Sequence, residues 1–447
     1  MEFKDALYSE GDINIGDNRA NWRNGLSEET RNMLDEDEKY FLHQSMSTPC
    51  LDVIERCEGS YLINSDGKKI LDFHGNSVHQ VGFKNEYVLQ KVKDQMGDLT
   101  FCTRRYTNQP AIQLAKKIVE TTDGRLDKVL FAPGGATANG MALKLARAVT
   151  GKFKVITFWD AFHGASLDTI SVGGESVFRK MMGPTMPGVE RIPPPNTYRG
   201  ILGNDEQKYV DYFRYVVEKE GDIGAFIAEP IRNTDVIVPS KSFWQQIRQI
   251  CDEHNIFLIF DEIPTGLGRT GEMFVFDHYG IVPDAVTLGK GLGGGLFPLA
   301  AMLTHRKYDV VSEISIGHYT HEKNPLSATA GLAVLECLEQ HALVEKARAY
   351  GNKIAEIFSQ WKENYSLVGD VRGLGLLWAI ELVTDRTTKE KAFDVAEKIM
   401  YQCLEEGVNF KVSQGNVIQL SPALTISEDE LMGGLQIIEN SLKKYSH

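Results

Sequence analysis

Two short apolar runs, each followed by an ionisable residue, most constrain what this chain can fold into. The run IFLIF at residues 256–260 ends at Asp261, and the run AVTL at residues 285–288 is followed by Gly289 and Lys290. Continuous apolar runs of this length are typical of strands buried on both faces, as in the parallel sheet of an α/β protein. Because ligands of such sheets bind at the carboxyl ends of the strands, we expect Asp261 and Lys290 to share one ligand site.

An acid and a lysine at one sheet edge suit the cofactor pyridoxal 5'-phosphate (PLP). That cofactor needs a lysine that forms a Schiff base with its aldehyde, and a carboxylate that keeps its ring nitrogen protonated so that the ring accepts electrons. In this interpretation Lys290 and Asp261 are the catalytic pair. The spacing alone is equally compatible with an aspartate that caps a turn and a lysine that faces water, because short motifs also occur by chance.

The residues around Asp261 and Lys290 favour the PLP site over the two unrelated surface roles. The segment DEIPTGLGRTG, which begins at Asp261, and the segment TLGK, which ends at Lys290, closely resemble the signature of class III (omega-type) aminotransferases. The resemblance extends from about Gly59 to Pro422. It implies PLP fold type I, an α/β large domain with a mostly parallel central sheet flanked by helices, plus a small α+β C-terminal domain. The expected parts are an N-terminal arm at 1–58, packing with the small domain and the active site, a large PLP-binding domain at 59–330 and a small domain at 331–447.

Composition and charge exclude several classes of function. The 447 residues carry a net charge of −13, which argues against a nucleic-acid-binding surface. No apolar run reaches the length of about 18 residues that a membrane span needs, and the N-terminus lacks the features of a signal peptide. The six cysteines are scattered, without a C-x-x-C pair, so we expect reduced thiols in a cytoplasmic protein.

The resemblance assigns further residues to the cofactor. A glycine-rich turn, GGAT, leads from an expected strand into an expected helix, and the free N–H groups of a helix N-terminus suit a phosphate. Gly135, Ala136 and Thr137 are the expected phosphate ligands; the hydroxyl that relatives usually carry at position 136 is absent, and Thr137 is its candidate replacement. In the family, side chains hold both faces of the pyridine ring, which assigns these roles to Phe162 and Ile263.

The resemblance also implies an obligate homodimer with shared active sites. The segment GHYTHEKNP at 317–325 matches the part of the family that reaches the neighbouring subunit, where Thr320 would bind the cofactor phosphate. His318 and His321 lie in the same segment, but no third metal ligand is near them in the sequence, so no metal site is expected.

Candidate substrate-binding residues come from three segments. Arg104 and Arg105 suit bidentate binding of a carboxylate, phosphate or phosphonate, and we expect one of them to enter the site because adjacent side chains point apart. Asn76 and His79 lie in a segment that borders the substrate in the family, and Glu229 ends another expected strand. Surface ion pairs and ordinary loop contacts are the alternative for these residues.

Three departures from the family pattern indicate a specialised branch. Gln419 stands where relatives that act on α-amino acids often carry a carboxylate-binding arginine, Pro264 replaces a glutamine that touches the cofactor, and Ala136 is the third departure. A carboxylate site without its cation loses a charge-assisted pair, so we expect a substrate without an α-carboxylate bound in the usual way. Glu229 is then expected to meet another cation, such as Arg232 or one of the two adjacent arginines.

The segments NSVHQVG at 76–82 and CTRRYTN at 102–108 most resemble a lyase branch of the family, the (R)-1-hydroxy-2-aminoethylphosphonate ammonia-lyases. This resemblance implies loss of the hydroxyl and release of phosphonoacetaldehyde and ammonia. A class III aminotransferase that acts on an amine or an omega-amino acid is the alternative. A non-catalytic PLP-binding regulator is a third hypothesis, which the intact Asp261 and Lys290 argue against.

Overall fold

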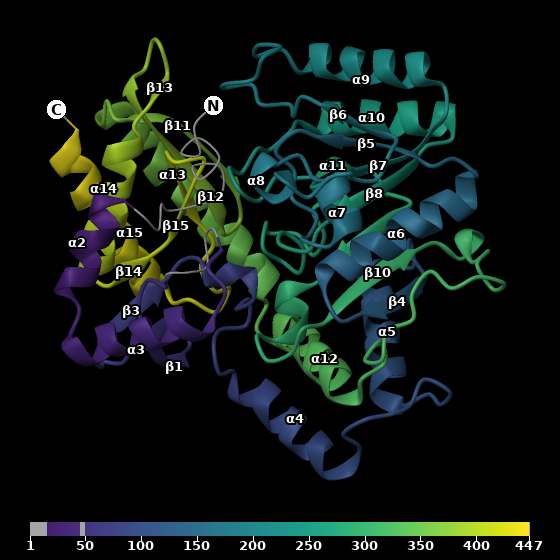
Figure 1. The fold of residues 1–447 in the computed structure, drawn as a ribbon, viewed down its shortest axis with the longest axis horizontal. Coiled ribbons are helices and arrows are strands. Elements are labelled where there is room, and N and C mark those ends of the chain that lie inside the picture. Colours follow the sequence, from purple (N-terminus) through teal and green to yellow (C-terminus); the bar gives the residue numbers. More distant parts are fainter. Residues whose placement is uncertain (1–15, 45–49, 447) are drawn as a thin grey trace.

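The structure is a computed structural model that describes residues 16–44 and 50–446. Two bodies lie side by side (Figure 1), a larger one built around a seven-stranded sheet and a smaller one built around sheets of five and four strands. Among the residues described, no helix has the length and apolar character that crossing a membrane requires. All six cysteines are free thiols.

The seven-stranded sheet is mostly parallel, as predicted. Its strands β5 to β9 run parallel to one another, whereas β10 pairs antiparallel with both of its neighbours, β4 and β9. In spatial order the strands are β4 (Lys128–Ala132), β10 (Ala300–Thr304), β9 (Ala285–Leu288), β8 (Phe257–Asp261), β7 (Ile223–Ala228), β5 (Lys154–Phe158) and β6 (Val189–Ile192).

Helices cover both faces of this sheet, which explains why its central strands are apolar throughout. Phe257 and Ile259 of β8 belong to the apolar cluster under α6 (Gly135–Thr150). On the other face, the ring of Phe260 lies 4.7 Å from that of Trp244 on α10 (Lys241–His254). The remaining helices of the larger body are α4 (Glu86–Asp98), α5 (Gln109–Thr121), α7 (Leu167–Val172), α8 (Ser176–Arg179), α9 (Glu206–Glu220), α11 (Phe276–Tyr279) and α12 (Pro325–Gln340).

The smaller body combines both ends of the chain. Its five-stranded sheet contains β11 (Val368–Leu374), β12 (Leu377–Asp385), β16 (Val417–Leu420) and β15 (Lys411–Ser413), with β13 (Glu390–Lys391) paired to β12. Its four-stranded sheet orders β1 (Ile54–Glu58), β2 (Tyr61–Asn64), β3 (Lys69–Asp72) and β14 (Val408–Asn409). Because β3 pairs with β14, residues just beyond the predicted boundary at 58 join the C-terminal sheets, and the domain boundaries themselves stay a prediction.

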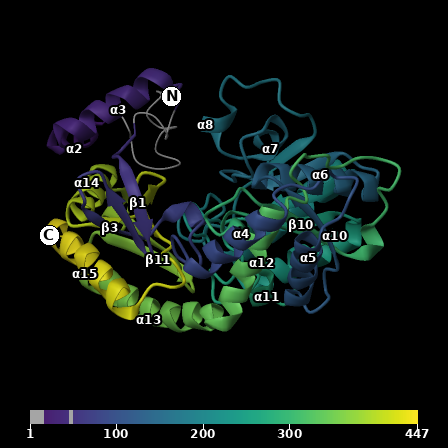
Figure 2. The ribbon, with the colours of Figure 1, turned by 90° about the horizontal axis from the view of Figure 1, so that it is seen from below.

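Helices also cover the smaller body, namely α13 (Leu343–Asn364), α14 (Phe393–Glu405) and α15 (Glu428–Tyr445), together with α2 (Asp17–Gly25) and α3 (Glu28–Tyr40) from the N-terminal segment. Figure 2 shows α2 and α3 lying over this body, beside α14. Asn18 of α2 donates a 2.8 Å hydrogen bond to the carboxylate of Glu397 on α14. The N-terminal segment therefore packs on the smaller body.

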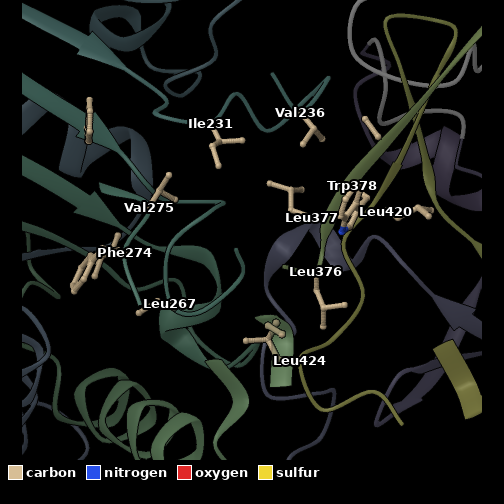
Figure 3. Close-up of a cluster of buried hydrophobic side chains, with 14 of the residues drawn as sticks. Ile231, Val236, Leu267, Phe274, Val275, Leu376, Leu377, Trp378, Leu420 and Leu424 are labelled. Carbon is tan, nitrogen blue, oxygen red and sulfur yellow. The ribbon is translucent and has the colours of Figure 1, made fainter. Parts of the chain in front are cut away.

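The two bodies share one continuous apolar core. Figure 3 shows side chains of the larger body facing those of the smaller one across their junction. The buried guanidinium of Arg269 crosses the same junction and donates hydrogen bonds to the carbonyls of Leu376 and Pro422. The labelled apolar residues are Ile231, Val236, Leu267, Phe274 and Val275 from one side and Leu376, Leu377, Trp378, Leu420 and Leu424 from the other.

Candidate active site

A cavity of about 640 Å³ opens where β8 and β9 end and is lined by residues of both bodies. It contains most of the predicted cofactor and substrate residues of this chain. Those that line it are Asn76, Gly135, Ala136, Phe162, Glu229, Asp261, Ile263 and Lys290. Pro264 lines it as well. The predicted residues outside this lining are His79, Arg104, Arg105, Thr137 and Thr320.

Asp261 ends β8 and is almost fully buried. Its Oδ2 lies 2.8 Å from His163 Nδ1 and accepts a 2.8 Å hydrogen bond from Asn139 Nδ2, while its Oδ1 accepts one from the N–H of Ile263. Asn139 is itself oriented by the Thr287 hydroxyl, which donates to its Oδ1 at 2.7 Å. The network keeps the carboxylate in one orientation at the cavity wall, suited to accept a hydrogen bond from a protonated ring nitrogen.

Lys290 follows β9 at the start of a short 3₁₀ turn, Lys290–Gly293. Its φ of 45° lies in the left-handed region, which is costly for a residue with a side chain and is typical of functional sites. The next residue is Gly291, where a Cβ would lie 1.9 Å from Gln80 Oε1 and would displace that side chain. Gln80 is buried and packs against this backbone directly after Lys290.

The phosphate end of the cavity is the N-terminus of α6. Gly134, Gly135 and Ala136 line it, and a Cβ at Gly135 would lie 2.6 Å from Ile263 Cδ1, which explains the glycine there. The first N–H groups of a helix have no partner within the helix and point toward such a ligand. The Thr137 hydroxyl donates to the Gly134 carbonyl at 2.6 Å, and its expected role as a phosphate ligand stays a prediction.

Glu229 lies beyond β7 and is only 6% exposed. Its carboxylate accepts hydrogen bonds from the N–H groups of Phe162 at 3.3 Å and Asn233 at 2.9 Å, and burial raises its pKa. Within the described part of the chain it forms no ion pair. The expected direct contact with Arg232 is wrong, because Arg232 pairs with other carboxylates, those of Glu175 at 3.1 Å and Asp235 at 2.8 Å.

His79 does not face the cavity. Its ring is buried, stacks on Phe83 with 5.0 Å between ring centroids, and has Nε2 3.3 Å from the Asp72 carbonyl. The left-handed turn at Gly75 passes directly over it, since a Cβ there would lie 2.1 Å from His79 Nδ1. His79 therefore supports the turn, while His74 lines the cavity and was missed in the sequence.

Arg104 and the segment that carries Thr320 meet on the surface, outside this chain's own cavity. The Arg104 guanidinium contacts the ring of His318, and the ring of Phe101 lies 5.4 Å from that of His321. Arg104, Arg105 and Thr320 are all exposed. The expectation that one of the two arginines enters the site is therefore not met within a single chain.

Comparisons with known proteins agree with this geometry. The family model described as aminotransferase class-III matches residues 43–442. An (R)-1-hydroxy-2-aminoethylphosphonate ammonia-lyase of Vibrio splendidus (strain 12B01) is 52% identical over 98% of this chain and 95% of its own length. A leucine/methionine racemase of Thermococcus litoralis is 33% identical over 84% of this chain and 87% of its own length.

Solved structures are similar as well. An aminotransferase of Bacillus anthracis has a TM-score of 0.88 and 26% identity, with 94% of this chain and 99% of that chain covered. An amine transaminase of an uncultivated Pseudomonas species, solved in its PLP-bound form, has a TM-score of 0.85 and 30% identity, with 91% and 99% covered. PLP is the cofactor that this similarity implies, and the helix N-terminus, the oriented carboxylate and the lysine of the cavity fit it. The chain belongs to the class III aminotransferase family and has the α/β architecture of PLP fold type I.

Proposed function

We propose that this chain is a PLP-dependent ammonia-lyase that converts (R)-1-hydroxy-2-aminoethylphosphonate to phosphonoacetaldehyde and ammonia. The 52% identity to the Vibrio ammonia-lyase along nearly the whole chain carries the proposal. The cavity supports it, because Gln419, near Glu229, brings no cation for an α-carboxylate. Gln419 is buried and donates a 3.2 Å hydrogen bond to Asn233, whose own N–H donates to Glu229.

The chain's residues have separate parts in this chemistry. Bound PLP would supply an electron-accepting ring and an aldehyde that combines with amines. The N–H groups at the start of α6 would hold its phosphate, Asp261 would accept a hydrogen bond from its ring nitrogen, and Phe162 and Ile263 would contact its ring faces. Lys290 Nζ would remove the proton from the substrate carbon that bears the amine. The hydroxyl on the neighbouring carbon then leaves as water, and one water is consumed when ammonia is released, so the atoms balance.

We further propose a homodimer with shared active sites. Arg104 contacts His318, which lies two residues before Thr320, and Phe101 packs on His321, on a surface outside this chain's cavity. Phe101, Tyr106 and Ile314, which lie in or next to these two segments, are large apolar side chains that are exposed, which is unusual for a surface that faces only water. In a dimer, Thr320 would contact the cofactor phosphate of the partner chain, and Arg104 or Arg105 would come near the partner's substrate.

An amine transaminase is the second candidate, because solved amine and omega transaminases share this fold over more than nine-tenths of the chain. The deciding experiment measures ammonia and aldehyde release from (R)-1-hydroxy-2-aminoethylphosphonate by PLP-loaded protein without a keto acid. Release over many turnovers supports the lyase, with the inactive Lys290→Ala variant as control. Turnover that begins only after pyruvate or 2-oxoglutarate is added refutes the lyase and supports the transaminase.

A further inference from the structure

Lys411 and His74 line the cavity but have no part in the chemistry described so far. Lys411 opens β15 and lies directly opposite Gln419 in the antiparallel pair of β15 and β16. Directly opposed residues place their side chains on the same face of a sheet. The face that carries Gln419 to Asn233, at the cavity wall, therefore carries Lys411 as well.

The backbone of His74 is held firmly beside it. The N–H groups of His74 and Gly75 donate to the two oxygens of the Asp72 carboxylate at 2.9 and 3.0 Å, and the Ser421 hydroxyl donates to the His74 carbonyl at 3.2 Å. Nδ1 of the His74 ring is buried, and in the described part of the chain it has no hydrogen-bond partner. Because Nδ1 is closed off and the Asn76 side chain interacts with the ring, a ligand in the cavity would meet the ring at Nε2.

Lys411 and His74 offer an anion two different kinds of contact, a positive charge and an uncharged N–H donor. Burial, together with the nearby ammonium groups of Lys411 and Lys290, lowers the pKa of His74 to about 4. At neutral pH the imidazole is then uncharged and carries one N–H that can be donated. A cation and a neutral N–H donor together provide what an anionic oxygen cluster needs.

The other cations near the site do not fill this role. Among the described lining residues Lys290 and Lys411 are the lysines, and no arginine is present. Lys290 is assigned to proton transfer, and Arg104 and Arg105 lie outside this chain's cavity. The remaining ionisable groups of the wall include the carboxyl groups of Glu229 and Asp261, which repel an anion when they are charged.

We propose that Lys411 and His74 form the subsite for the substrate's phosphonate, with the Lys411 ammonium as its ion-pair partner and the His74 N–H as a hydrogen-bond donor. The identity of the anion rests on the proposed function. The position of the subsite rests on the cavity wall and on the strand register, so the two can be tested separately.

The test uses 2-aminoethylphosphonate, which has the amine and the phosphonate but no hydroxyl that could leave, and ethylamine, which lacks the anion. Binding of each to PLP-loaded protein is measured by calorimetry. Lys411→Met is expected to raise the Kd of 2-aminoethylphosphonate about 10- to 100-fold, the loss of a charge-assisted hydrogen bond, and to leave the Kd of ethylamine unchanged. Lys411→Arg is expected to keep most of the affinity, and His74→Phe to lose less than Lys411→Met.

Lys398→Met is the matched control, because Lys398 is an exposed lysine of the same body that pairs with Asp394 along α14. Unchanged affinity for 2-aminoethylphosphonate in Lys411→Met, or an equal loss for ethylamine, overturns the subsite. Lys411→Gln repeats the test if the methionine variant does not fold. Protein that releases no ammonia from the hydroxylated substrate but still needs Lys411 for 2-aminoethylphosphonate would refute the lyase and keep the subsite.

Discussion

The Nδ1 atom of His163 lies 2.8 Å from Oδ2 of Asp261, and both side chains are buried residues that line the cavity. A second donor, Asn139, shares the same carboxylate oxygen at 2.8 Å. The two neighbours fix the direction of the carboxylate before any ligand arrives. Such preorganisation is effective in catalysis because no free energy is spent on reorientation during the reaction.

Replacing Asp261 with asparagine should therefore reduce kcat by about 100- to 1000-fold, the range found when a preorganised electrostatic group is removed. The change keeps the side chain's shape but removes its charge. Glu262→Gln is the matched control, because Glu262 is not among the residues that line the cavity and accepts hydrogen bonds from the N–H groups of Val275 at 2.7 Å and Phe276 at 3.0 Å. Ammonia-release kinetics of both variants check the prediction, and wild-type kcat in Asp261→Asn would contradict it.

Glu262 should also make stability depend on pH. Burial raises its pKa from 4.5 to about 8, so the folded protein binds this proton more tightly than the unfolded chain does. The contribution of this proton to stability is fully present below the unfolded pKa and is lost as pH rises through the folded one. The midpoint of thermal unfolding should thus fall between about pH 5 and pH 8 more steeply in the wild type than in Glu262→Gln. Equal slopes measured by calorimetry would refute this assignment.

Arg232 is expected to matter for stability. Its guanidinium is 6% exposed and pairs with the buried carboxylates of Glu175 and Asp235. Arg232→Met leaves both carboxylates without their cation, which should cost about 3–5 kcal/mol. The exposed pair of Arg214 with Glu253 offers a control, since Arg214→Met should cost no more than about 1 kcal/mol. Urea-induced unfolding of the two variants gives the comparison, and similar losses would show that burial is not decisive here.

Shared active sites can be tested with hybrid dimers. Lys290→Ala removes the lysine of a chain's own site, while Thr320→Glu should repel the cofactor phosphate of the partner's site. If sites are shared, each single variant is inactive, but a hybrid dimer of the two has one site with both changes and one site with neither. Co-expression with two different tags, followed by activity measurement of the purified hybrid, should recover about half of the wild-type activity per dimer on this count. A hybrid as inactive as its parents would argue that Thr320 acts within its own chain.

The central pair of the site could be predicted because its signal is local. Asp261 and Lys290 each follow an apolar run, and these runs are the adjacent parallel strands β8 and β9. The groups that orient Asp261 had no such signal. His163 and Asn139 lie 98 and 122 residues away in the sequence, and only the folded sheet brings them together.

The choice between His74 and His79 shows a second limit. Both belong to one short segment, and spacing alone does not tell which side chain faces the ligand. A left-handed turn at Gly75, Asn76 and Ser77 reverses the chain there, so that His79 is turned inward and His74 toward the cavity. Three consecutive residues with positive φ are rare, and the sequence signals this turn only through its glycine.

Replacing Gln419 with the arginine of the family should shift the substrate preference from the hydroxyaminophosphonate toward α-amino acids. Gln419 is 1% exposed, donates to Asn233, and has an Oε1 atom for which the described residues offer no partner. In Gln419→Arg, a guanidinium enters beside Glu229 and favours the charged form of this carboxyl, whose pKa is now raised by burial. We expect ammonia release from the hydroxyaminophosphonate to fall at least about 10-fold, because a new buried ion pair reshapes the wall opposite Lys411.

The same arginine should add affinity for α-amino acids, since it offers a bidentate partner to their carboxylate. Calorimetry with L-alanine is expected to detect binding to Gln419→Arg and not to the wild type. Gln419→Met, which has similar volume and no charge, separates the effect of the cation from that of lost packing. If the methionine and arginine variants lose the same activity and neither binds alanine, then the residue at position 419 acts through packing, and the missing cation does not determine the substrate.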